Sequence, residues 1–278
     1  MALIETRHKP LTTSPLKLSA PLGAAMAFMG MAGSLPLLHG SQGCTAFALV
    51  MMVRHFREAI PLQTTAMNEI STILGGMEQV EQALLNMTGR AKPAVIGLIS
   101  TALAETRGED MQGELKLILA RRPELAGTTV VHVSAPDYDG SLEMGWSKAV
   151  TALVQLAEPT PRRLDQVNLL PGVHLTPGDV EHLKEMVEAF GLEPVALPDL
   201  SGSLDGHVPD AYTPTTLGGT SMERVRGLGG ARLTIAVGEH MRPAAEALHK
   251  RTGVPYVLFD RLTGLDAVDR LTVTLSNL

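Results

Sequence analysis

The stretch that decides the fold runs from residue 35 to residue 45 and reads Leu-Pro-Leu-Leu-His-Gly-Ser-Gln-Gly-Cys-Thr. Its apolar first half predicts a short buried strand, and its two glycines predict a tight turn. Residues 46–53, which contain no polar side chain, predict a buried helix. A strand, a glycine turn and a helix in this order are typical of an α/β fold. The only cysteine of the chain, Cys44, therefore falls at the start of a helix.

A cysteine at a helix start faces free backbone N–H groups and the positive end of the helix dipole, which stabilise a thiolate. Three roles are open for Cys44: a small buried core residue, a nucleophile or a metal ligand. A nucleophile would take His39 or His55 as its base, but no residue pattern supplies a third, orienting group. An iron–sulfur cluster needs about four thiolates. If Cys44 is a cluster ligand, the other ligands come from another polypeptide.

The composition indicates a cytoplasmic α/β protein. Hydrophobic residues make up 45% of the 278 residues, enough for two cores, while aromatic residues make up only 3%. The cores must therefore be built from aliphatic residues and 14 methionines, which favours helices packed on sheets. The net charge is −6 and no basic cluster is present, so nucleic acid is not an expected partner. A single cysteine fits a reducing cytoplasm.

Residues 18–53 contain no Asp, Glu, Lys or Arg, which raises the question of a membrane span. A spanning helix needs about 20 continuous apolar residues. This stretch is interrupted by Pro21, Gly30, Gly33, Pro36 and the polar residues 40–43. We therefore expect no membrane partner and no export signal.

Apolar runs alternate with helical patterns along the rest of the chain. Residues 93–101 form a continuous apolar run, typical of a parallel strand covered on both faces. Further strands are expected at residues 128–134, 167–170, 193–197, 232–237 and 255–259. The fold class is thus α/β, with Rossmann-like domains whose mostly parallel sheets are flanked by helices.

The segment Pro159-Thr-Pro-Arg-Arg163 interrupts both periodicities and is the best linker candidate. We expect an N-terminal arm at residues 1–17, a first Rossmann-like domain at 18–160 that carries the Cys44 loop, and a second at 161–278. The last helical pattern, from residue 264, has no stop signal, which predicts a truncated helix.

A second candidate site is the loop at residues 199–207, which contains Asp199, Asp205 and His207 together with two serines. It follows a predicted strand, at the sheet edge where open α/β folds bind ligands. The alternative is a polar loop that satisfies its own turns. P-loop and zinc-ligand spacings are lacking, and the glycines at 227–230 precede a strand, which is the wrong context for dinucleotide binding.

Three motifs carry a resemblance to a known family: Pro21-Leu-Gly-Ala, His39-Gly-Ser-Gln-Gly-Cys44-Thr-Ala-Phe and Arg54-His-Phe-Arg-Glu58. In this order they resemble the β-type subunits of the nitrogenase molybdenum–iron protein family. Residues 175–179, 199–207, 252–255 and 264–269 resemble the branch that forms the scaffold for iron–molybdenum cofactor assembly. Other cluster-ligand positions of the catalytic subunit are occupied here by Ser19-Ala20, Ala102 and Asp137.

The resemblance implies a scaffold subunit with no catalytic residue of its own. It would form a heterotetramer with a NifE-type partner and share a bridging [4Fe-4S] cluster through Cys44, within a loop formed by Gly40, Ser41, Gly43 and Thr45. It also implies contact with the nitrogenase Fe protein and a cofactor-precursor donor. The family carries a third Rossmann-like domain, which we expect to be missing here.

Two interpretations remain open beside the scaffold. Arg54, His55 and Arg57 are either interface or cluster-environment residues or an ordinary solvated helix end. The whole chain could also be a stand-alone Rossmann-type enzyme or small-ligand binder that uses residues 199–207, or a structural fragment without activity.

Overall fold

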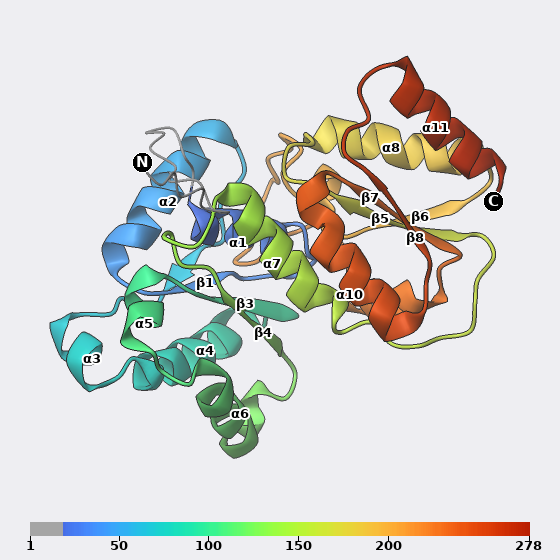
Figure 1. Cartoon of the computed structure of the whole chain (residues 1–278). Coiled ribbons are helices and arrows are strands. Elements are labelled where there is room, and N and C mark those ends of the chain that lie inside the picture. The colour runs from blue at the N-terminus through green and yellow to red at the C-terminus, as the bar shows by residue number, and fades with distance from the viewer. Residues whose placement is uncertain (1–18) are drawn as a thin grey trace, which may run out of the picture.

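The computed structural model describes residues 19–278, so the expected arm at residues 1–17 lies outside the described residues. Two four-stranded parallel sheets, one in each half of the chain, form its framework (Figure 1). The α/β fold class and the parallel sheets predicted from the sequence are confirmed. No helix within residues 19–278 is long and apolar enough to cross a membrane.

The first sheet has the strand order β2-β1-β3-β4. Its strands are β1 (Leu37–His39), β2 (Gln63–Thr64), β3 (Val95–Ser100) and β4 (Thr129–Ser134). Every residue of β3 is buried, as the continuous apolar run predicted. The register pairs His39 with Ser100 and Ser100 with Ser134, so three strands end side by side. The loop that leads to Cys44 leaves from this edge.

Seven helices accompany the first sheet: α1 (Ala20–Met29), α2 (Gln42–His55), α3 (Glu69–Leu74), α4 (Met77–Ala91), α5 (Ala102–Arg107), α6 (Met111–Arg121) and α7 (Leu142–Val154). The sequence analysis did not predict α3. A capping box explains its formation, since Asn68 accepts from the Ser71 backbone N–H and the Ser71 side chain accepts from the Asn68 N–H.

The second sheet has the strand order β6-β5-β7-β8. Its strands are β5 (Gln166–Pro171), β6 (Glu193–Ala196), β7 (Leu233–Val237) and β8 (Tyr256–Phe259), and its helices are α8 (Pro177–Ala189), α9 (Met222–Arg226), α10 (Arg242–Thr252) and α11 (Leu265–Ser276). The predicted start of α8 is confirmed, because Thr176 caps the helix just before Pro177 and forms a capping box with Asp179 in the first turn.

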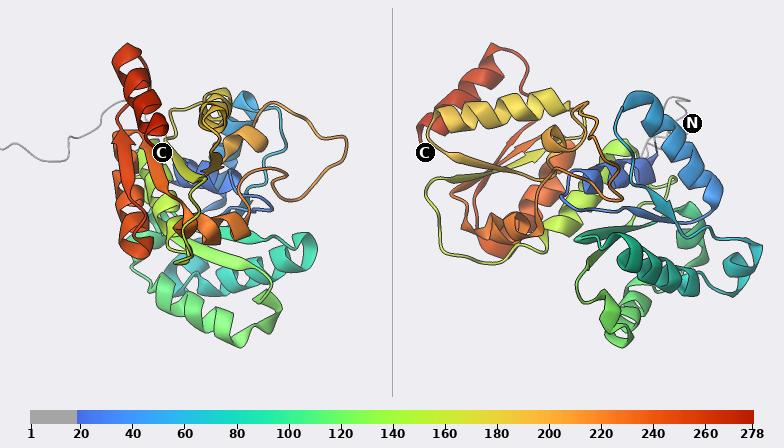
Figure 2. Two further views of the ribbon diagram at one scale, coloured as in Figure 1. Left: turned by 90° about the vertical axis from the view of Figure 1, so that its right-hand side faces the viewer. Right: turned by 180° about the vertical axis from the view of Figure 1, so that it is seen from behind.

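Helix α7 lies between the two sheets and packs on α1 and on α10 (Figures 1 and 2). Glycines allow α1 and α7 to touch through their backbones: a Cβ on Gly23 would lie 1.9 Å from Leu142 O, and one on Gly145 would lie 1.8 Å from Ala20 O. The buried Trp146 of α7 donates from Nε1 to Pro171 O at 3.0 Å. One hydrophobic cluster therefore contains residues of both halves.

The long segment after β6 returns to the first half of the chain. Asp199 N and Thr220 N both donate to Gly30 O, at 3.0 and 2.9 Å, and Thr216 N donates to Ser34 O at 3.1 Å. Gly219 adopts φ +98° where this segment meets the α1–β1 turn, and a Cβ there would lie 2.5 Å from Gly30 O. Residues 199–220 thus bind the two halves together.

The expected burial of α2 is wrong. Only Thr45, Ala48 and Met52 of this helix are buried, whereas Phe47 is 70% exposed. Because residues 46–53 are all apolar, the sequence has no apolar–polar periodicity that would show which side of the helix is buried. In the single chain, one side of α2 packs on the first half and the other has no neighbour among the described residues that would bury it.

Candidate functional site

Cys44 is the third residue of α2, after Ser41 at the N-cap. Its thiol is exposed, and its Sγ atom lies 3.3 Å from Ser41 Oγ. The Ser41 side chain makes no capping bond to the backbone. The amides of the first turn therefore have no side-chain cap and are oriented to stabilise negative charge at this helix start.

Two threonines fix the loop that precedes Cys44. Thr65 Oγ1 accepts from Gly40 N at 3.2 Å, and both the N and the Oγ1 of Thr101 donate to His39 O at 3.0 Å. A Cβ on Gly40 would lie 2.1 Å from Thr101 Oγ1, so the glycine is required for this approach. The loop is held at the carboxyl ends of β1 and β3, the edge at which open α/β sheets bind ligands.

His39 is fully buried behind this loop, and its Nδ1 lies 2.9 Å from Thr65 Oγ1. Thr65 Oγ1 contacts both the Gly40 backbone N–H and the His39 ring, and so ties the imidazole to the loop. Burial lowers the pKa of His39 to about 4, against a smaller opposing effect of Glu109. His39 is thus a neutral structural residue that faces Thr65 and Glu109 and makes no bond to the Cys44 thiol.

A second polar cluster, which the sequence analysis missed, lies at the end of β3. Ser100 Oγ donates to Glu105 Oε1 and lies 3.1 Å from His132 Nε2. The strand register could have predicted this cluster, because polar residues at the ends of neighbouring parallel strands lie at the same edge of the sheet. Burial lowers the pKa of His132, while the Glu105 carboxylate opposes the shift.

The other predicted residues of the Cys44 loop and of the end of α2 differ in their exposure to solvent. Thr45 is buried, and its Oγ1 has no hydrogen-bond partner among residues 19–278, whereas Gly43 lies in open space. Arg54, His55 and Arg57 are exposed at the end of α2. The His55 ring packs edge-on against Phe56 at 4.7 Å between centroids and lines an apolar cavity of about 360 Å³.

Large apolar side chains cover the solvent side of α2. We call this set the α2 face; it consists of Phe47, Val50, Met51 and Val53. Exposed apolar groups gathered on one helix are typical of an interaction surface. They lie on the same helix as the exposed Cys44 thiol.

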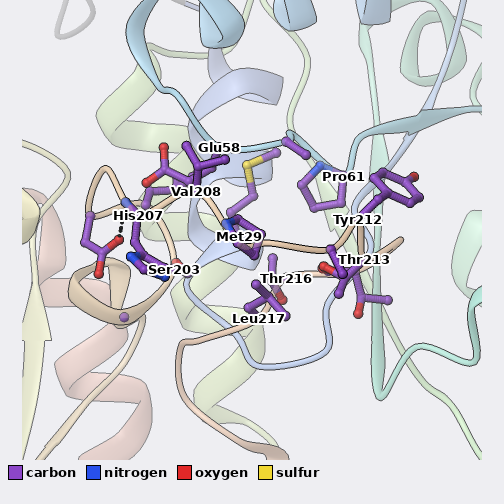
Figure 3. A pocket seen from close by; sticks show the side chains of 17 residues that line it. Met29, Glu58, Pro61, Ser203, His207, Val208, Tyr212, Thr213, Thr216 and Leu217 are labelled. Carbon is purple, nitrogen blue, oxygen red and sulfur yellow. Dashed lines mark hydrogen bonds between the residues drawn. The ribbon is translucent and has the colours of Figure 1, made fainter.

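The structure separates the candidate residues of the loop at 199–207. Asp199 is engaged by Lys184, whose Nζ donates to Asp199 Oδ2 at 2.9 Å, and by the N and Oγ of Ser201. Asp205 accepts from His207 N at 2.9 Å, and these two residues line a pocket of about 290 Å³ (Figure 3). Glu58, which the sequence analysis did not single out, also lines this pocket and accepts from Gly206 N.

Metal-ligating side chains do not cluster in the part of the chain that the structure describes. Within residues 19–278 no group of three or more His, Cys, Asp or Glu side chains could hold a metal ion. Cys44 is consequently a single donor.

The family model described as Nitrogenase component 1 type Oxidoreductase matches residues 19–278. The chain belongs to this family. The resemblance seen in the sequence motifs is thereby confirmed. A solved member described as Nitrogenase Cp1 at pH 6.5 superposes with a TM-score of 0.90 at 30% identity, covering 99% of this chain and 60% of that one. The chain therefore has the nitrogenase component 1 fold.

Curated relatives within the family carry the name nitrogenase iron-molybdenum cofactor biosynthesis protein NifN. The protein of Mesorhizobium japonicum is 55% identical over 280 residues, which are 99% of this chain and 61% of the relative. That of Rhizobium meliloti is 55% identical and covers 100% of this chain and 64% of the relative. The protein of Bradyrhizobium diazoefficiens is 50% identical, and the match covers 100% of this chain and 60% of the relative. The chain thus spans about three fifths of their length.

Proposed function

We propose that this chain acts in the biosynthesis of the nitrogenase iron–molybdenum cofactor, as part of a scaffold subunit that shares a [4Fe-4S] cluster with a NifE-type partner through Cys44. The observation that carries the proposal is the exposed single thiol on the same helix as the uncovered α2 face. The names of its NifN relatives support the biosynthetic role.

The donor set fits one corner of a cluster. Cys44 is exposed, as a ligand to a group shared with a second polypeptide must be, and no second thiol exists in the chain. Ser41 Oγ lies within hydrogen-bond reach of the sulfur, at a helix start whose first-turn amides favour a negatively charged ligand group. When bound, a [4Fe-4S] cluster supplies one-electron transfer. The role of this chain is to hold and orient one sulfur.

The α2 face is the surface that we assign to the partner. Burying its side chains removes apolar surface from water, which favours association with a partner. Because these side chains share a helix with Cys44, the protein that covers them comes close to the thiol. Arg54, His55 and Arg57 extend the same helix and are proposed as contacts at its margin. The family resemblance further suggests the nitrogenase Fe protein and a cofactor-precursor donor as partners in the cytoplasm.

Anaerobic co-expression with a NifE-type subunit tests the proposal. The co-purified complex is analysed for iron and by EPR, in the wild type and in Cys44→Ala, with Gln42→Ala in the same helix turn as the matched control. We expect Cys44→Ala to lose the cluster signal while the complex still forms, and Gln42→Ala to retain both. Unchanged iron and EPR in Cys44→Ala would refute the bridging role.

The pocket beside Glu58 supports a second candidate function, the binding of a small molecule by the chain alone. Two carboxylates and an imidazole, from Glu58, Asp205 and His207, line about 290 Å³ of space with the apolar Met29 and Pro61. This combination of apolar wall and few polar groups is typical of ligand sites. Tight binding of a small molecule that is lost in His207→Ala and kept in His182→Ala would favour this function.

A further inference from the structure

Two histidines occupy equivalent positions at the carboxyl edge of the second sheet. Strands β5 and β7 are parallel neighbours, and their last register pair is Pro171 with Val237. Counting three residues onward from each leads to His174 and His240. Each histidine lies in the same kind of turn, closed by Leu175 N to Gly172 O and by Met241 N to Gly238 O, both at 3.0 Å.

Glycines bring the two imidazoles together. A Cβ on Gly172 would lie 2.7 Å from His240 Cε1 and 2.8 Å from His174 Cε1, and a Cβ on Gly238, at φ +99°, would meet the same two atoms at the same distances. The ring centroids are 5.6 Å apart, with the ring planes at 75°. Any side chain other than hydrogen at either glycine would push the rings out of this position.

The edge between β5 and β7 is also where the connections of the sheet diverge. From β5 the chain crosses to β6 on one side, and from β7 it crosses to β8 on the other. In open α/β sheets, ligands bind in the crevice outside the carboxyl ends of the strands at this point. The two histidines therefore lie where this architecture places ligands.

His240 carries a polar ring atom that the described part of the protein leaves without a partner. Its Nε2 is buried and has no hydrogen-bond partner among residues 19–278. Burial lowers the pKa of His240, His174 adds to the shift and the Glu143 carboxylate opposes it. A ring nitrogen without a partner in this part of the chain is available as a metal ligand.

We infer that His174 and His240 bind one divalent transition-metal ion of the borderline class, such as Zn²⁺ or Co²⁺. Metal–nitrogen bonds of about 2.0–2.1 Å to a shared ion place two ring centroids roughly 5–6 Å apart, which the observed separation matches. Imidazole ligands select this class over Mg²⁺ and Ca²⁺, which prefer oxygen.

The two imidazoles leave the remaining coordination positions of the ion open. No third His, Cys, Asp or Glu of the described residues completes the set, so these positions fall to water or to a bound molecule. An ion with open positions binds and polarises carboxylates, carbonyls and other oxygen ligands. The site is separate from Cys44 and does not depend on the proposed scaffold function.

The test uses Co²⁺ alone, added to the 278-residue chain in a Cys44→Ser background so that the thiol cannot contribute. Binding is followed by calorimetry and by the visible absorption of Co²⁺, and the histidine Cε1–H NMR signals are followed during a Zn²⁺ titration. We expect one ion per chain and shifts of the His174 and His240 signals. Even the loss of an outer partner weakens metal sites roughly 10- to 100-fold, so His174→Gln and His240→Gln should each raise the dissociation constant about tenfold or more.

His182→Gln is the matched control, because His182 is an exposed histidine on α8 that pairs only with Glu185 at 3.3 Å. It should bind the ion as the parent does. Circular dichroism and metal-free unfolding of each variant establish that the fold is kept. If one variant does not fold, the Zn²⁺-dependent shifts of the His174 and His240 NMR signals in the parent still test the inference. The inference is overturned if the parent binds no Co²⁺ or Zn²⁺ at millimolar concentration, or if folded His174→Gln and His240→Gln variants bind as the parent does. In either case the rings form only an edge-to-face aromatic contact.

Discussion

His39 Nε2 and Glu109 Oε2 lie 3.9 Å apart, and both atoms are buried with no hydrogen-bond partner among residues 19–278. The other carboxylate oxygen of Glu109 accepts from Gly76 N at 2.9 Å and pairs with Arg107 at 3.0 Å. Since His39 Nδ1 is hydrogen-bonded to Thr65 Oγ1, and Thr65 Oγ1 accepts from Gly40 N, a line of polar contacts runs from Glu109 to the loop that carries Cys44. The position of the thiol is therefore set by residues on three separate segments.

Acid should destabilise the folded chain through His39. Its pKa is lowered from 6.5 to about 4 by burial. Between these pH values the unfolded chain binds a proton that the folded chain does not, so the free energy of unfolding falls as the pH falls, by about 3 kcal/mol in total. Urea unfolding at pH 7, 6, 5 and 4 measures this loss. The lowered pKa values of His132 and His240 act in the same direction. In His39→Gln the loss between pH 6.5 and 4 should become smaller; an unchanged loss would contradict the assignment.

Gly40→Ala should destabilise the chain by about 2 kcal/mol or more, because the added methyl would lie 2.1 Å from Thr101 Oγ1 in the packed loop. Gly43→Ala is the control, since a Cβ there meets only Ser41 Oγ at 4.0 Å and alanine favours the helix. Denaturant unfolding of both variants measures the difference. Equal stability of the two would show that Gly40 is not constrained by Thr101.

Phe47→Asp should leave the free energy of unfolding of the single chain within about 0.5 kcal/mol of the parent, because the ring is 70% exposed. It should nevertheless weaken association with a NifE-type partner, since it places a charge in the α2 face. Leu117→Asp on α6, where the leucine is 58% exposed, is the matched control. Co-purification and calorimetry with the partner provide the comparison. Equal partner affinity of the two variants would remove the α2 face from the interface.

Gly145→Ala should reduce stability by several kcal/mol, since its methyl would lie 1.8 Å from the backbone oxygen of Ala20 and would force α7 away from α1. Gly89→Ala on α4 has no atom within 4 Å of the new methyl and should stabilise by about 0.5–1 kcal/mol. Thermal unfolding followed by circular dichroism distinguishes the signs. A decrease in stability of similar size in both variants would show that the contact between Gly145 and Ala20 does not limit the packing of α7 on α1.

The sequence was sufficient to predict elements that local chemistry specifies. The apolar run of β3, the capping box at Thr176 and the glycine turn before Cys44 are each complete within about ten residues. The short helix α3 was missed although its Asn68 cap is equally local, because its six residues carry too little periodicity.

The candidate sites required contacts that no local pattern contains. His39 and Glu109 are 70 positions apart in the sequence, and only the fold brings them together. Glu58 joins Asp205 and His207 at the pocket for the same reason. Which side of α2 is buried could not be predicted from its apolar sequence. Among the described residues, nothing covers its outer side. The pairing of His174 with His240 depends on the β5–β7 register.

The crossing of α1 and α7 at Gly23 and Gly145 has a mechanical consequence. Backbone in direct contact with backbone leaves no soft layer of side chains to slide, and the segment at residues 199–220 fastens the opposite side. Bending at residues 159–163 would have to break both sets of contacts. Relative movement of the two sheets therefore requires backbone contacts and hydrogen bonds to break, not only side chains to rearrange.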